Sequence, residues 1–131
     1  HQRMGMGHPK SATYEFHVDD DKYFADLQHF TDSEAEASFG SKHDDPFISA
    51  YALRGDKGEK AARVMSTVHH IIKRHVSKNP ELKTIDFTSD MFEPSRVSLY
   101  TRYTKKMGGE THGSSIDPTR YHRIPADSYR K

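Results

Sequence analysis

The sequence predicts an α+β fold, in which a mixed, mostly antiparallel sheet packs against two helices. Several short segments alternate apolar and polar residues, a pattern typical of half-buried strands. Two longer segments carry apolar residues at helical spacing. Strands and helices alternate in the second half of the chain. The expected order is strand, strand, strand, helix, strand, helix, strand: a hairpin followed by a strand–helix–strand crossover.

The first two strands are expected to form a hairpin. Residues Tyr14–Val18 alternate apolar and polar, and the polar run Asp19–Lys22 predicts a turn. Residues Tyr23–Phe30 predict the returning strand. One face of that strand would carry Tyr23, Ala25 and Leu27.

The third strand is expected at Phe47–Leu53, because this segment is apolar on both faces, as in a central strand. The preceding residues, 31–46, are rich in serine and aspartate and include Gly40 and Pro46. They predict a loop, with at most a short edge strand around Ala37–Phe39.

A long helix is expected from Gly58 to His75. Its apolar face is formed by Ala61, Met65, Val68 and Ile72. Asn79-Pro80 should end it, since proline cannot continue a helix.

The next strand is expected at Leu82–Thr88, with Ile85 and Phe87 facing inward. A second helix should begin at Glu93-Pro94-Ser95 and end at Gly108-Gly109. Its apolar stripe consists of Val97, Tyr100, Tyr103 or Thr104, and Met107. Residues Tyr121–Ile124 predict a last strand at the edge of the sheet.

The length of 131 residues fits one domain. We expect a flexible leader at residues 1–12, a single α/β domain at 13–126 and a flexible tail at 127–131. Only 33% of the residues are hydrophobic and the mean hydropathy is −0.94. The core should therefore be thin, and a protein partner or a second copy of the chain could help to stabilise it.

The charge balance favours no particular class of partner, since the formal net charge is +1 and the pI is about 8.2. The chain has no cysteine, which excludes disulfides, thiolate nucleophiles and cysteine-ligated metals. No apolar run approaches the ~18 residues that a membrane-spanning helix needs. These features favour a cytoplasmic protein that does not enter a membrane.

The glycine-containing turn Arg54–Lys60 is the strongest candidate for a binding site. A strand that ends in such a turn and leads into a helix directs unpaired backbone N–H groups at one point, which favours an anion. Arg54, Lys57 and Lys60 add positive charge, and a pyrophosphate would suit the site. Alternatively, Gly55 and Gly58 serve only a tight connection, and the lysines are solvated.

This order of elements, with the pair Leu99-Tyr100 in the second helix, resembles the core of the GCN5-related N-acetyltransferase (GNAT) family over residues 47–109. The resemblance implies that acetyl-CoA is the cofactor and that an amine is acetylated. Its pyrophosphate would bind at Arg54, Gly55, Lys57, Gly58 and Lys60. Tyr100 would be the catalytic residue that protonates the departing CoA thiolate; alternatively, it is a core aromatic.

The segment Phe87–Met107, which includes Glu93–Tyr100, also resembles uncharacterised bacteriophage proteins that carry a PSRVxLY helix. This second resemblance suggests a viral origin and a place in the host cytoplasm or the virion. It leaves open a non-catalytic GNAT-like domain with a virion-structural or host-interaction role.

The ten histidines show no zinc-binding spacing, so no metal site is predicted. His17 and His29 could face each other across the hairpin. The acidic runs at 19–21 and 44–45 are interpreted as solvated turns.

Basic residues follow the second helix and the C-terminal segment. They are Arg96, Arg102, Lys105, Lys106, Arg120, Arg123, Arg130 and Lys131. With Tyr103 and Tyr121 they could contact nucleic acid through phosphates and stacking, but an ordinary solvated helix face is the favoured explanation.

Overall fold

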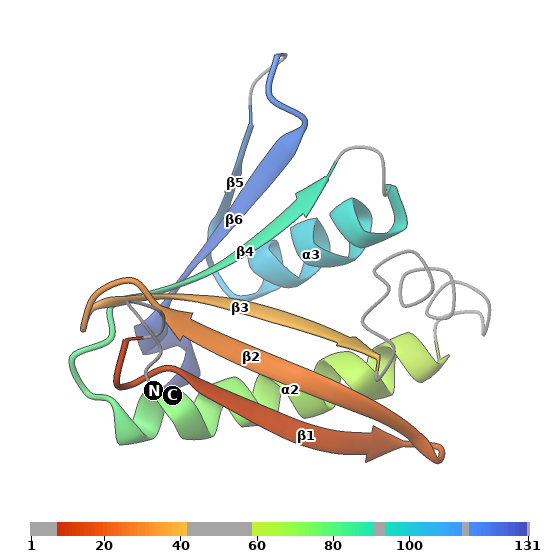
Figure 1. The fold of residues 1–131 in the computed structure, drawn as a ribbon. Coiled ribbons are helices and arrows are strands. Elements are labelled where there is room, and N and C mark those ends of the chain that lie inside the picture. The colour runs from red at the N-terminus through yellow and green to blue at the C-terminus, as the bar shows by residue number, and fades with distance from the viewer. Residues whose placement is uncertain (1–7, 42–58, 91–93, 114–115, 131) are drawn as a thin grey trace.

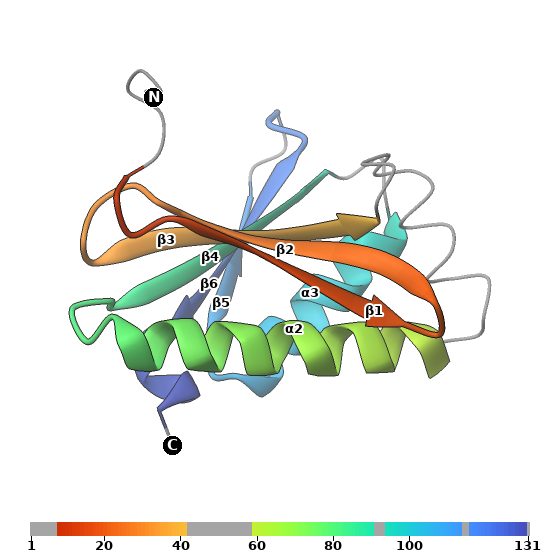
Figure 2. The ribbon, with the colours of Figure 1, turned by 60° about the horizontal axis from the view of Figure 1, so that its bottom comes forward.

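The computed structural model describes residues 8–41, 59–90, 94–113 and 116–130. Within these ranges the chain forms a six-stranded sheet with two helices on one face (Figures 1 and 2). The predicted α+β class with a mixed sheet is therefore confirmed. The strand expected at Phe47–Leu53 lies outside the described residues.

The sheet has the order β1-β2-β3-β4-β6-β5. The strands are β1 (Ala12–Val18), β2 (Asp21–His29), β3 (Glu34–Ser41), β4 (Thr84–Asp90), β5 (Glu110–His112) and β6 (Thr119–Pro125). The helices are α2 (Glu59–Lys78) and α3 (Pro94–Lys106), and the short 3₁₀ helix η1 is Ala126–Tyr129. Neighbouring strands are antiparallel except β3 and β4, which are parallel because the chain between them includes α2.

The two faces of the sheet differ in chemistry because side chains alternate along each strand. The face toward the helices carries the core, with Leu27, Ile85, Phe87 and Ile124 fully buried. From α2, Val64, Val68 and Ile72 pack onto this face at the predicted helical spacing. The opposite face is polar, and on it Arg123 forms a paired contact with the Asp86 carboxylate at 2.9 and 3.0 Å.

Residues 34–41 form β3, an interior strand of the sheet. The sequence predicted a loop over 31–46 with at most a short edge strand around Ala37–Phe39, and for residues 34–41 this prediction is wrong. The segment alternates strictly, and its buried residues are Ala35, Ala37 and Phe39. Alanine is a weak strand former, and the surrounding serines and aspartates predict a turn. Pairing with β2 on one side and β4 on the other decides its structure.

The last predicted strand exists but is not at the edge. β6 lies between β4 and β5, and the edge is occupied by β5, a strand of three exposed residues. Such a short polar strand carries no periodic signal.

The glycine pair after α3 has a clear steric basis. Gly108 has φ +78°, a conformation that favours glycine at the end of a helix. A Cβ on Gly109 would lie 2.2 Å from the Arg123 carbonyl oxygen. The predicted end of the helix is therefore confirmed.

The expected leader and tail both contain residues with defined contacts. Ser11 Oγ accepts a hydrogen bond from the His29 backbone N–H at 2.9 Å, and Lys10 Nζ lies 2.8 Å from Glu81. Tyr129, in η1, is 1% exposed and belongs to the core. None of the helices in the described ranges is both long and apolar enough to cross a membrane.

Candidate functional site

The parallel strands β3 and β4 pair over only three positions and then diverge. The paired residues run from Glu34 opposite Thr84 to Glu36 opposite Asp86. β3 continues to Ser41 and β4 to Asp90, and Figure 1 shows the two strands spreading apart beside α3. Within the described residues, the inner edges of both strands are not paired with each other beyond this point. Such edges can accept the amide groups of an extended ligand.

Tyr100 lies against the residues that flank this divergence. It is 2% exposed, and its ring contacts Phe39 of β3 at 5.9 Å and Phe87 of β4 at 5.1 Å between centroids. The ring of His122 in β6 lies 5.6 Å away, edge to face. The tyrosine predicted to be catalytic is thus a buried aromatic that bridges the two diverging strands.

Arg96 lies one helical turn before Tyr100 and is also buried, at 8% exposed. Its Nη1 donates to the Tyr100 hydroxyl oxygen at 2.7 Å and to the Phe39 carbonyl oxygen at 3.5 Å. The guanidinium carbon lies 5.3 Å from the Phe39 ring centroid and 5.7 Å from that of Tyr100. The prediction that Arg96 lies with the other basic residues on the surface of the helix is therefore wrong.

Among the described residues, the other side of the Arg96 guanidinium has no hydrogen-bond partner. Nε and Nη2 are both buried, and neither contacts an acceptor in the part of the chain that the structure describes. No described carboxylate forms an ion pair with Arg96 either. A buried cation in this state is costly, because water has been removed and nothing replaces it.

A second polar group lies beside Tyr100 and is fully bonded. His122 Nε2 is 2.7 Å from Ser89 Oγ, and His122 Nδ1 is 2.9 Å from Thr111 Oγ1. Burial lowers the pKa of His122, so the imidazole is neutral near pH 7. This cluster fixes the orientation of the His122 ring that contacts Tyr100.

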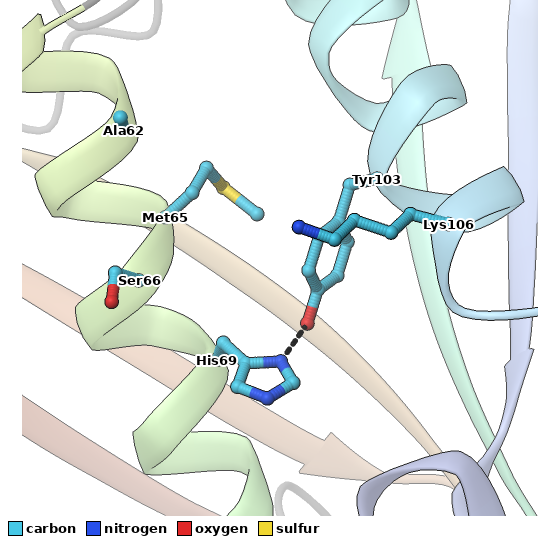
Figure 3. A pocket seen from close by; sticks show the side chains of 6 residues that line it. All are labelled: Ala62, Met65, Ser66, His69, Tyr103 and Lys106. Atoms are coloured by element: carbon cyan, nitrogen blue, oxygen red, sulfur yellow. Dashed lines mark hydrogen bonds between the residues drawn. The ribbon is translucent and has the colours of Figure 1, made fainter.

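An interhelical cleft of about 370 Å³ lies between α2 and α3 (Figure 3). It is lined by Ala62, Met65, Ser66, His69, Tyr103 and Lys106. In Figure 3 the side chains of Met65 and Lys106 extend into this space from opposite helices. The cleft combines an apolar lining with one ammonium group and one imidazole, which suits an amphipathic ligand.

The polar groups at the cleft form a chain of three hydrogen-bonded side chains. The Tyr103 hydroxyl is 2.8 Å from His69 Nδ1 and 2.9 Å from the Tyr129 hydroxyl. Burial raises the pKa of Tyr103 to about 12 and also raises that of Tyr129, so both phenols keep their protons. Burial, reinforced by His70, Lys73 and Lys106, lowers the pKa of His69. A neutral His69 carries one ring hydrogen, so its Nδ1 either accepts a hydrogen bond from the Tyr103 hydroxyl or donates one to it, according to the tautomer.

A third polar cluster, the histidine network, lies at the other end of the sheet. His29 Nε2 is 2.8 Å from His75 Nε2, and His75 Nδ1 is 2.8 Å from the Tyr14 hydroxyl. His29 Nδ1 is 3.2 Å from the Thr31 carbonyl oxygen, which can only accept. One placement of the protons gives all four ring nitrogens a hydrogen-bond partner of the right kind. In it Tyr14 donates to His75, His75 donates to His29, and His29 donates to the Thr31 carbonyl oxygen.

This arrangement differs from the one suggested by the sequence, in which His29 faces His17. His17 is exposed and lies opposite Lys22, whereas His29 points to the buried face and packs on α2. Among the described residues, no three His, Asp or Glu side chains come together as metal ligands would.

The predicted pyrophosphate site falls almost entirely outside the described residues. Arg54, Gly55, Lys57 and Gly58 all lie there, and that part of the site stays a prediction. Lys60 is in the first turn of α2, and the structure does not describe its side chain. The first turn of α2 directly follows the predicted glycine turn in the sequence.

The basic residues proposed for nucleic-acid contact do not form one surface group. Arg102, Lys105 and Lys106 are exposed on α3, but Arg96 is buried and Arg123 is paired with Asp86. Tyr103 is held by His69 and Tyr129.

No protein-family model matches the chain, and a comparison with curated proteins finds no match. The function is therefore inferred from the positions of this chain's own residues.

Proposed function

We propose that this chain is a GNAT-like domain that binds an acyl-CoA at the divergence of β3 and β4 and transfers the acyl group to an amine. The observation that carries the proposal is the three-residue pairing of these parallel strands, with Tyr100 packed against both beyond it. Together with the order of elements, this arrangement supports the GNAT-like interpretation of the sequence.

The divergence suits the pantetheine arm of a CoA ester. This arm is extended and carries two amide groups, which can hydrogen-bond to the inner edges of β3 and β4 as an added strand would. The flanking side chains are aromatic and buried, namely Phe39, Phe87 and Tyr100. A thioester bound there would be shielded from water, which strengthens any hydrogen bond to its oxygen or sulfur.

Tyr100 is the residue proposed to donate a proton to the departing thiolate. Guanidinium can only donate, so the Tyr100 oxygen accepts in its contact with Arg96, and the phenol O–H is the proton donor that the proposal requires. The amine would attack the thioester carbonyl carbon directly, the C–S bond would break, the sulfur would take the phenolic proton, and the proton lost by the amine nitrogen would then restore the phenol. The resulting phenolate would be stabilised by the charge of Arg96.

The interhelical cleft offers a place for the polar, nucleotide end of the CoA ester. It lies beside α2, whose first turn follows the glycine turn Arg54–Gly58 in the sequence. Lys106 supplies an ammonium group and His69 an imidazole at this cleft. We propose that the nucleotide part of CoA extends along it.

Calorimetric titration of the protein with acetyl-CoA and with free CoA tests this proposal. Both should bind with a dissociation constant below ~100 µM and raise the melting temperature as their concentrations increase. No heat and no melting shift at millimolar ligand would exclude acyl-CoA binding.

The role of Tyr100 is tested with Tyr100→Phe, using Tyr121→Phe, at an exposed tyrosine of β6, as the control. Acetyl transfer to a panel of amines should fall at least tenfold in Tyr100→Phe while acetyl-CoA affinity stays within about threefold. Equal loss in both variants would mean that Tyr100 is only a packing residue. Binding without transfer to any amine would assign a non-catalytic acyl-CoA-binding role.

A further inference from the structure

The Arg96 side chain presents an unused hydrogen-bonding edge inside the protein. Its Nη1 is occupied by Tyr100 and Phe39, whereas Nε and Nη2 have no partner among the described residues. These two nitrogens lie on one side of the planar guanidinium, and their N–H groups point in parallel. This edge is the one that binds both oxygens of a carboxylate at once.

The surroundings of Arg96 define what the missing partner should be. The side chain is more than nine-tenths buried, lies between the rings of Phe39 and Tyr100, and has no carboxylate partner in the described ranges. Ring faces attract the cation but do not accept its N–H groups in the plane. The partner must therefore be planar, accept two hydrogen bonds side by side and carry about one negative charge.

A carboxylate meets these requirements better than a phosphate. Its single charge neutralises the guanidinium, whereas a phosphate dianion would bring an uncompensated charge into an apolar site. Its two oxygens match the separation of Nε and Nη2 in the plane of the fork.

We propose that Arg96 is a substrate-binding residue that holds a carboxylate of a substrate at this site. The inference rests on the proposed function and makes it more specific. One of the two substrates carries a carboxylate as well as the group that reacts. Arg96 donates to the Tyr100 hydroxyl at 2.7 Å, so the bound carboxylate lies close to the reacting thioester. It belongs either to the acyl group, as in a succinyl-type CoA ester, or to an amino-acid acceptor.

Calorimetry on the intact chain with four probes tests the inference: acetyl-CoA, succinyl-CoA, glutamate in the presence of CoA, and free succinate. Each is titrated into wild type, Arg96→Met and Arg96→Lys. Arg96→Lys is the matched control, because it keeps the charge and lacks the paired N–H edge. Arg96→Met removes the charge and keeps most of the volume.

The inference predicts that wild type binds one carboxylate-bearing probe at least tenfold more tightly than its counterpart without that carboxylate. A preference for succinyl-CoA over acetyl-CoA places the carboxylate on the acyl group, and glutamate binding places it on the acceptor. The preference should disappear in Arg96→Met and fall at least fivefold in Arg96→Lys. Equal affinities of wild type and Arg96→Met for every probe would overturn the inference.

The outcomes for the two proposals are separable. If acetyl-CoA binds and no carboxylate adds affinity, the carboxylate inference fails while the acyl-CoA proposal stands. If no CoA ester binds but free succinate binds in an Arg96-dependent way, the carboxylate site stands and the acyl-CoA proposal fails. The melting temperature of each apo variant shows whether it is folded, so loss of affinity in a folded Arg96→Met is a loss of recognition.

Discussion

Two groups of buried polar side chains, at opposite ends of the sheet, differ in how completely they are hydrogen-bonded. In the histidine network, His29, His75 and Tyr14 satisfy one another, and His29 donates outward to Thr31. In the Arg96–Tyr100 cluster, two of the three guanidinium nitrogens have no partner in the described chain. His75 and Tyr100 are each 2% exposed, so burial does not explain the difference.

The completeness of hydrogen bonding distinguishes a group that stabilises the fold from one that is available for a ligand. A fully bonded buried network contributes to stability and is costly to disrupt. A buried charge without a partner destabilises the apo protein and is retained where a ligand supplies the partner.

Replacing His75 by alanine should lower the free energy of unfolding by about 3 kcal/mol. The change removes a 2%-exposed side chain and leaves both the His29 imidazole and the Tyr14 hydroxyl without their partner. Urea denaturation followed by far-UV circular dichroism measures the loss. As a control, Tyr14→Phe should cost only about 1 kcal/mol, because it deletes one partly exposed hydrogen bond. A loss below 1 kcal/mol in His75→Ala would contradict a stabilising role for the network.

Acidification should destabilise the wild-type protein between pH 6.5 and about pH 4. Burial lowers the pKa of His75 to about 4, so the folded chain stays unprotonated there while the unfolded chain takes up a proton. The unfolded state thus binds more protons, and stability decreases as pH falls through this window, by roughly 2 to 3 kcal/mol for this group.

Denaturation midpoints measured at half-unit pH steps check this dependence, and His75→Gln is the comparison variant. It lacks the titrating group, so its stability should change less over the same interval. Parallel pH profiles for the two proteins would show that His75 titrates at its ordinary pKa.

Tyr103→Phe should lower the free energy of unfolding by about 1 to 2 kcal/mol. The hydroxyl bonds both His69 and Tyr129, and its loss leaves the buried Tyr129 hydroxyl unsatisfied. Thermal unfolding by calorimetry measures the effect. The exposed Tyr121→Phe serves as the control and should stay within about 0.5 kcal/mol of wild type. Equal stability of the two variants would contradict the hydrogen-bonded chain at the cleft.

Arg96→Met should change the free energy of unfolding of the apo protein least. Unlike the other variants, it should stabilise the protein. Removal of an uncompensated buried charge is expected to raise the free energy of unfolding by between zero and about 2 kcal/mol. The same denaturation experiment used for His75→Ala gives a direct comparison. A loss above 1 kcal/mol would show that the Arg96–Tyr100 cluster stabilises the fold in the way that the histidine network does.

Periodicity in the sequence predicted much of the fold. The hairpin, the long helix and the inward face of β4 follow from apolar spacing, and Gly108-Gly109 ends α3 as expected. β3 was missed because its alternation depends on alanines within a serine- and aspartate-rich segment. The position of β6 could not be deduced, because strand order depends on long-range pairing with β4 and β5.

The candidate site was only partly predictable. Tyr100 was singled out through the Leu99-Tyr100 pair of the family resemblance, but Arg96 was grouped with exposed basic residues since charge normally indicates a solvated face. The helical spacing held a usable signal: Arg96 precedes Tyr100 by four residues and so belongs to the same buried stripe. The pairs His29–His75 and Tyr103–Tyr129 join distant segments and leave no local pattern.

The acyl-CoA proposal is tested most directly by calorimetric titration of the wild-type chain with acetyl-CoA, with the Tyr100→Phe variant measured alongside. If the chain binds acyl-CoA as proposed, both proteins should show saturable one-to-one binding with a dissociation constant below ~100 µM. Their melting temperatures should rise as the acetyl-CoA concentration increases. Absence of binding at millimolar acetyl-CoA, in a protein that melts cooperatively, would contradict it.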